Sequence, residues 1–239
     1  MRSFAKYGWS SAALVLALAL GCGGDDEAET GATVDETSGA ETARVARNDG
    51  VQISGLMGTI DADEVRMAIE PRLTRFLRCF ARRYDEIEVL GGHIHMSFRV
   101  DVEGNVIWVF PNESTIGDRE TERCLIETAA AIRFPRPRGG EAEFGYPLDL
   151  DPPEDVRPPV AWAESSVADV LEANRGSLRE CGSGFSVTLY IAPGGEVMAA
   201  GAAADDLDRA ANIDCVTDAV RQWEMPDPGS YPAKVSFSI

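Results

Sequence analysis

Residues 94–106, IHMSFRVDVEGNV, decide the fold, because the same pattern returns at residues 185–197, FSVTLYIAPGGEV. In each stretch a large apolar side chain occupies every second position, which is typical of a strand with one buried face. Each stretch then reaches a glycine, Gly104 or Gly195, and a valine two positions later begins a second apolar run. The pattern therefore predicts, twice in one chain, two strands joined by a tight turn.

The match between these two stretches extends over most of the chain. Upstream, Cys79 and Cys181 each lie at the end of a segment whose apolar residues have helical spacing. Downstream, Cys124 and Cys215 lie twenty positions after the glycine of their own half, and a Pro-x-Pro sequence follows eleven positions later in both halves. A last apolar alternation then ends each half. Repetition on this scale indicates a duplicated structural unit.

Each half is expected to fold as helix, strand, strand, helix, strand. The predicted fold class is therefore α+β, with two tandem small domains that each place their helices on one face of a short antiparallel sheet. We expect the first domain at residues 62–150 and the second at residues 164–239. A proline-rich linker, residues 151–163, separates them and should be extended and semi-rigid. The halves differ by eleven residues, which fall between the first cysteine and the first strand.

The N-terminal region has the pattern of an exported lipoprotein. Arg2 and Lys6 precede a short apolar run, which is typical of a secretory signal peptide at residues 1–21. The run is shorter than the roughly 20 apolar residues that a membrane-spanning helix needs. The junction LALGC, residues 18–22, resembles the lipobox of bacterial lipoproteins, in which the cysteine is acylated after cleavage. Cys22 is therefore the expected lipid anchor, with an ordinary signal peptide as the alternative.

The segment after the anchor is expected to be a disordered acidic tether, residues 22–61. It is rich in Gly, Ala, Thr, Asp and Glu and contains few large apolar side chains. Such a segment buries too little surface to offset the loss of chain entropy on folding. Together with an acylated Cys22, it predicts a lipoprotein of the cell envelope. Glycine rather than aspartate at position 23 favours the outer membrane, with the protein facing the periplasm or the surface.

Charge argues against nucleic acid as a partner. The chain has 22 basic and 40 acidic residues and a formal net charge of −18, whereas phosphate binding needs clustered positive charge. One segment departs from this acidity, because the predicted first helix carries a stripe of five arginines: Arg72, Arg75, Arg78, Arg82 and Arg83. Solvation or pairing with acidic residues, including those of the tether, explains the stripe. Contact with an anionic envelope component is the alternative.

Four cysteines remain once Cys22 is assigned to lipid, and an even number in an exported protein suggests two disulfides. In each half one cysteine comes late in the first helix and the other early in the second. If both helices pack on the same face of one sheet, Cys79 meets Cys124 and Cys181 meets Cys215. Bridges between the halves and unbridged thiols are the alternatives. The chain has no closely spaced cysteine pair of the kind that binds zinc.

The only two histidines, His93 and His95, are candidate metal ligands because they lie two residues apart. They alternate with the apolar positions of the first strand, so their side chains should point away from the core. Their counterparts in the second half, Gly184 and Ser186, bind no metal. We therefore expect solvated histidines and neither a metal nor a cofactor, with a surface metal site as the alternative.

The order of these landmarks resembles the AgmX/PglI C-terminal domain family, which is similar in outline to the TonB C-terminal domain. The resemblance covers residues 62–150 and 164–239. It is carried in the first half by Cys79, Gly104, Cys124, Phe134 and Pro135, and in the second half by Cys181, Gly195, Cys215, Met225 and Pro226.

The family occurs in envelope and gliding-related proteins of myxobacteria and offers no catalytic residues to carry over. The resemblance therefore implies a non-enzymatic role, either structural or in binding an unidentified envelope protein, for example by strand addition at an exposed sheet edge. We find no catalytic arrangement in the sequence. A metal-dependent enzyme that uses the face of His93 and His95 is one alternative, and a passive ligand carrier is another.

Overall fold

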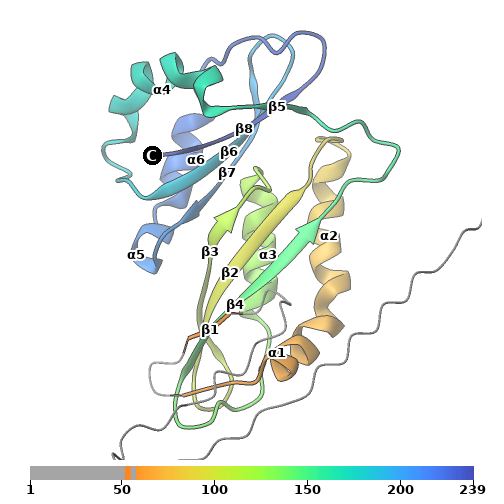
Figure 1. Ribbon diagram of the computed structural model, residues 1–239, viewed down its shortest axis with the longest axis vertical. Helices are drawn as coiled ribbons and strands as arrows, with labels where there is room; N and C mark the ends of the chain where they lie inside the picture. The colour runs from red at the N-terminus through yellow and green to blue at the C-terminus, as the bar shows by residue number, and fades with distance from the viewer. Residues whose placement is uncertain (1–51, 55–57) are drawn as a thin grey trace, which may run out of the picture. The chain divides into compact units, whose positions relative to one another are not determined.

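The computed structural model describes residues 52–54 and 58–239, which belong to one compact unit. The predicted signal peptide, Cys22 and most of the predicted tether lie outside the described residues. The described part is mixed α+β, as the alternating patterns predict (Figure 1). None of its helices is long and apolar enough to span a bilayer.

The first half builds a four-stranded antiparallel sheet in the order β1-β4-β2-β3. Its elements are, in chain order, β1 (Gln52–Ser54), α1 (Ala62–Ile69), η1 (Glu70–Arg72), α2 (Leu73–Tyr84), β2 (Gly92–Val100), β3 (Val106–Ser114), α3 (Arg119–Ala130) and β4 (Ala142–Leu150). Helices α2 and α3 lie side by side against this sheet (Figure 1). Pro71 lies in the tighter η1 turn, because proline has no N–H for a regular helix interior.

The second half builds a four-stranded sheet in the order β5-β8-β6-β7. Its elements are β5 (Val160–Trp162), η2 (Glu164–Val167), α4 (Ala168–Asn174), η3 (Arg175–Leu178), β6 (Phe185–Ile191), β7 (Val197–Ala204), α5 (Leu207–Ala210), α6 (Ile213–Val220) and β8 (Ala233–Ser238). Strand β5 runs parallel to β8, and the other strand pairs are antiparallel. The expectation of a purely antiparallel sheet is therefore wrong for this half.

Two short edge strands lie where the sequence predicts no regular structure. Strand β1 falls within residues 22–61, the predicted disordered tether, and β5 falls within residues 151–163, the predicted linker. Each pairs with part of the last strand of a half, β4 or β8. The predictions for these two segments were wrong for the same physical reason. The edge of a sheet offers unpaired backbone groups, and three residues of almost any sequence can form hydrogen bonds with them.

The apolar alternation that opens the sequence correctly predicts the core of the first half. Ile94, Met96, Phe98 and Val100 are all fully buried. The ring of Phe98 stacks on that of Phe144, with centroids 5.0 Å apart.

Each half also contains one disulfide, in the pairing that the repeat predicts. Cys79 is bonded to Cys124 and Cys181 to Cys215, with Cα–Cα distances of 5.6 and 5.5 Å. The first bond joins α2 to α3. The second joins the turn after η3 to α6. Neither bond links the two halves.

Candidate functional site

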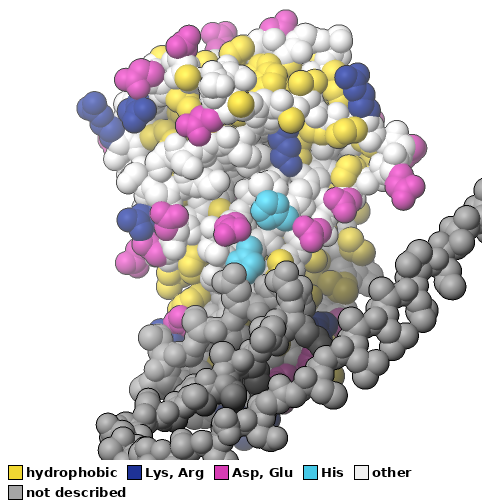
Figure 2. All heavy atoms as spheres, in the orientation of Figure 1, with side chains coloured by type: hydrophobic (Ala, Val, Ile, Leu, Met, Phe, Trp, Pro, Cys, Tyr) yellow, Lys and Arg dark blue, Asp and Glu magenta, His cyan; other side chains and the backbone are white. Residues whose placement is uncertain are grey.

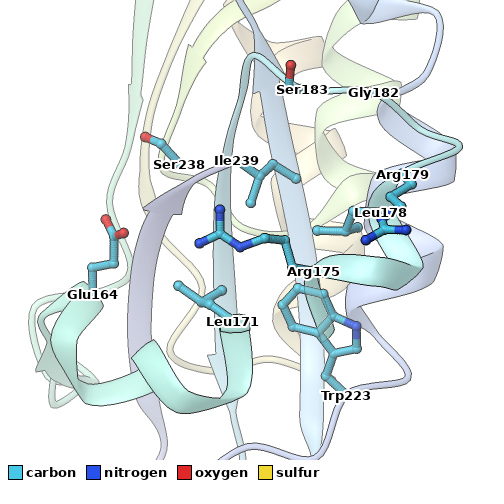
Figure 3. A pocket seen from close by; sticks show the side chains of 10 residues that line it. All are labelled: Glu164, Leu171, Arg175, Leu178, Arg179, Gly182, Ser183, Trp223, Ser238 and Ile239. Atoms are coloured by element: carbon cyan, nitrogen blue, oxygen red, sulfur yellow. The ribbon is translucent and has the colours of Figure 1, made fainter. Parts of the chain in front are cut away.

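A cavity of about 260 Å³ lies in the second half, between α4, η3 and the end of β8 (Figure 3). Its walls are mainly apolar and include Leu171, Leu178, Trp223 and Ile239. Trp223 is buried and stacks on Phe237 of β8, with ring centroids 6.2 Å apart. A cavity of this size and lining accommodates one or two apolar side chains of a ligand.

Two arginines, Arg175 and Arg179, border the cavity. Figure 3 shows Arg175 reaching across it between Leu171 and Ile239. Arg175 forms an ion pair with Glu172 at 3.2 Å, but both side chains are largely exposed, so this pair holds the guanidinium only weakly. Arg179 forms no ion pair within the described part of the chain. Glu164 also lines the cavity, so the apolar walls are bordered by two arginines and one carboxylate, with a net positive charge.

The edge of strand β8 lies beside this cavity. Phe185 and Ile239 exchange two backbone hydrogen bonds, of 3.1 and 3.0 Å, so they form a hydrogen-bonded pair between β6 and β8. In an antiparallel ladder the neighbouring pair, Ser186 and Ser238, must then point its backbone groups away from the partner strand. Strand β5 covers β8 only as far as Val235. The N–H and C=O of Ser238 thus face outward, and Ser238 lines the cavity.

The connection that leads to the first strand differs between the halves and helps to explain why the cavity lies in the second. In the first half this connection is longer by eleven residues, and its Ile87, Val89 and Leu90 are buried in the core. The second half has only Gly182, Ser183 and Gly184 before β6, and the first two of these line the cavity. The short connection has no apolar side chain with which to fill the space.

The two histidines lie on the outward face of β2, as predicted, but in different environments. Figure 2 shows them on one face of the molecule with acidic side chains nearby. His93 is exposed, and its Nδ1 lies 3.0 Å from the hydroxyl of Thr115. His95 is half-buried rather than solvated, with its Nδ1 2.6 Å from Asn112 Oδ1 and its Nε2 buried without a hydrogen-bond partner. Among residues 58–239, no three His, Cys, Asp or Glu side chains are grouped to hold a metal ion.

A buried polar junction between the halves was not predicted from the sequence. Glu122 of α3 is fully buried and accepts hydrogen bonds from Ser114 Oγ at 2.7 Å and from the backbone N–H of Ala202 at 3.0 Å. Burial raises the pKa of this carboxyl to about 7, although both hydrogen bonds oppose the shift. Gly201, the residue before Ala202, leaves room for the carboxylate, since a Cβ there would overlap it.

A second group of contacts continues the junction across β6 and β8. The hydroxyl of Tyr190 donates to the carbonyl of Gly91 at 2.8 Å and accepts from its N–H at 3.0 Å. Lys234 Nζ donates to the same carbonyl at 2.5 Å and lies 5.0 Å from the centre of the Tyr190 ring. Burial lowers the pKa of Lys234 to about 8. The second sheet is therefore covered on one face by its own helices, and the first half covers the other face at β6 and β7, whereas Ser236 and Ser238 of β8 stay exposed.

The sequence did carry a signal for this junction. Strand β7 has the sequence VMAAGAAA, in which six of eight residues are Ala or Gly, and nearly all of them are buried. Small side chains on a strand permit another segment to approach its backbone closely. A comparison with protein-family models, with curated proteins and with solved structures finds nothing that matches this chain.

Proposed function

We propose that the chain is a non-enzymatic lipoprotein of the outer membrane whose second half binds an extended segment of another envelope protein. The observation that carries the proposal is the outward-facing backbone of Ser238 beside an apolar cavity with Arg175 and Arg179 at its mouth. The membrane location rests on the signal and lipobox pattern at residues 1–22. The resemblance to AgmX/PglI and TonB C-terminal domains supports an interaction role.

The binding mode follows from the geometry of the edge. A partner strand that lies along β8 beyond Val235 exchanges backbone hydrogen bonds with Ser238, and these bonds supply affinity that depends little on sequence. Its side chains alternate between two sides, so one apolar side chain enters the cavity beside Leu171 and Trp223. An acidic residue next to it pairs with Arg175 or Arg179. The preferred partner is therefore an extended segment with one apolar and one acidic anchor.

The test uses a displayed library of random dodecapeptides, selected on the immobilised full chain. Binding of the enriched peptides is then measured by fluorescence anisotropy. The Ser238→Pro variant removes the outward N–H without touching the ladder to β6, because edge positions tolerate proline. We expect it to weaken binding at least about ten-fold, the loss of roughly one well-formed hydrogen bond. The matched Ser238→Ala variant keeps the N–H and should bind like the wild type.

Two further variants test whether the arginines at the cavity recognise an acidic anchor of the peptide. Arg175→Gln together with Arg179→Gln should weaken peptides that carry an acidic anchor and leave neutral peptides unaffected. Arg221→Gln, at an exposed position outside the cavity, is the control. Equal binding by Ser238→Pro and Ser238→Ala, or no enrichment of any peptide, contradicts the proposal.

A passive carrier of an anionic amphiphile is the second candidate function, and the apolar cavity bordered by Arg175 and Arg179 favours it. Dodecanoate is a suitable probe, because it has an apolar chain and a single carboxylate. Saturable binding of dodecanoate that survives Ser238→Pro and is lost in Leu171→Asp would favour the carrier over the peptide-binding site.

A further inference from the structure

Helix α2 has an exposed face that combines apolar and basic side chains. Its buried side consists of Phe76, Cys79 and Phe80, which belong to the core. The opposite side, named here the α2 outer face, consists of Leu73, Arg75, Leu77, Arg78 and Arg82, all of them exposed. Leu77 is 56% exposed and Leu73 36% exposed, so both leucines present apolar surface to solvent.

The arginines of this face have no anionic partner in the described part of the chain. Arg75, Arg78 and Arg82 take part in no ion pair, whereas Arg83 on the inner side of α2 is paired with Asp118 at 3.2 Å. The helix from Leu73 to Tyr84 contains no acidic residue. In a chain with a net charge of −18, these cations are available for an external anion.

The arrangement of the face follows from helical geometry. Leu73 and Leu77 lie one turn apart on the same side, because residues four apart are neighbours on a helix surface. Arg78 and Arg82, also four apart, form an adjacent row, and Arg75 lies near Arg78 because residues three apart are neighbours as well. Apolar and basic rows that run side by side on a helix are typical of surfaces that lie on a membrane, where the apolar row enters the headgroup region and the basic row meets lipid phosphates.

We propose that the α2 outer face docks on a bilayer surface that carries anionic lipids. The acidic segment at residues 25–41 is the competing occupant, because its charge is complementary. That segment has few large apolar side chains, so it would neutralise the arginines and leave Leu73 and Leu77 in water. A bilayer surface removes the leucines from water and also places lipid phosphates beside the arginines. This surface is distinct from the cavity at β8, so the inference does not depend on peptide binding there.

The test measures sedimentation of the full chain with vesicles of phosphatidylcholine, with and without phosphatidylglycerol. Cys22→Ser prevents acylation, so a lipid anchor cannot dominate the result. The variant Arg75→Gln/Arg78→Gln should lower the partition coefficient on anionic vesicles about 30-fold, since each arginine near such a surface contributes roughly a factor of five. Arg136→Gln/Arg221→Gln makes the same change in net charge at two exposed arginines elsewhere and should leave the partition coefficient unchanged.

A second pair of variants tests the apolar row. Leu77→Ser should weaken binding to anionic vesicles several-fold, because a leucine side chain that leaves water contributes on the order of ten-fold when fully buried. Ile107→Ser is the control, because Ile107 on β3 is 49% exposed. Circular dichroism confirms that each variant remains folded.

Three results would overturn the inference. The first is equal binding to vesicles with and without phosphatidylglycerol. The second is an equal loss in the Arg75/Arg78 and Arg136/Arg221 variants, which would show an effect of net charge alone. The third is vesicle binding that appears only after the acids of residues 25–41 are changed to amides, which would assign the α2 outer face to that acidic segment.

Discussion

Glu122 accepts the backbone N–H of Ala202 at 3.0 Å, and this hydrogen bond joins the two halves of the chain although eighty residues separate its partners. Ala202 lies on β7, an edge strand of the second sheet. Edge strands carry backbone groups that need partners, and here a buried carboxyl from the other half supplies one. The junction between the halves therefore depends on an ionisable side chain, which makes it sensitive to pH.

Replacing Glu122 with glutamine should reduce the pH dependence of stability between about pH 5 and pH 8. The folded pKa of Glu122, about 7, is above the ordinary value of 4.5, so its contribution to the free energy of unfolding is fully present below the ordinary value and is lost as pH rises through 7. The loss amounts to about 2–3 kcal/mol over this range. Urea unfolding at both pH values measures it.

The groups around Glu122 fix the design of that experiment. Asp118, the N-cap residue of α3, and Arg119 lie near it, and Lys234 of β8 interacts with it electrostatically. The lowered pKa of Lys234 has the opposite effect on the free energy of unfolding, but only as pH rises above about 8. The measurements therefore stop at pH 8. Glu127→Gln on the exposed side of α3 is the control for overall charge. The same pH profile in both variants would contradict the role given to Glu122.

A methyl group at position 201 should loosen the junction. In Gly201→Ala the new Cβ meets the Glu122 carboxylate and lies 2.8 Å from the backbone nitrogen of Asp118, so the halves must shift apart. We expect a loss of about 1–3 kcal/mol in the free energy of unfolding. Gly176→Ala is the matched control, because a Cβ at that position meets nothing within 4 Å. If both substitutions have the same effect, close packing at Gly201 is not important.

Tyr190→Phe removes one hydroxyl that makes two hydrogen bonds to the backbone of Gly91. Because Tyr190 is fully buried, water cannot replace the lost partner, and we expect a loss of about 1–3 kcal/mol. Thermal unfolding by calorimetry measures the change. Tyr146→Phe provides the comparison, since Tyr146 is only half-buried and makes no hydrogen bond within residues 58–239. Its substitution should change the free energy of unfolding by less than about 0.5 kcal/mol.

The two disulfides should contribute nearly equally. They close loops with sequence separations of 45 and 34 residues, for which the chain-entropy model gives about 4 kcal/mol each. Cys79→Ala/Cys124→Ala and Cys181→Ala/Cys215→Ala should therefore lower the free energy of unfolding by similar amounts. Peptide mapping without reduction should recover only the two bonds within halves. A peptide that joins Cys79 or Cys124 to the second half would refute the pairing.

The sequence was sufficient for those features that depend on local periodicity. The alternation of Ile94, Met96, Phe98 and Val100 identifies a buried face without any knowledge of what covers it. The cysteine pairing followed from the order of elements in each half.

The same reasoning failed where burial depends on the other half. Thr188 and Tyr190 occupy the outward positions of β6, and alternation places them in water, yet both are fully buried. The short strand β5 was missed because its pairing depends on the position of β8 and not on its own residues. The candidate site at Ser238 was missed for the same reason, since an unpaired strand edge is a property of the sheet.

The docking of one half on the other is not reciprocal, and this limits assembly. Positions 190 and 234, which receive the first half, correspond through the repeat to Arg99 and Glu143, which instead pair with each other at 3.6 Å. Position 201 corresponds to Phe110, a large side chain where the second half has a glycine. A head-to-tail array built by the same contact would therefore not extend beyond two units, because the first half lacks the residues that receive this contact in the second.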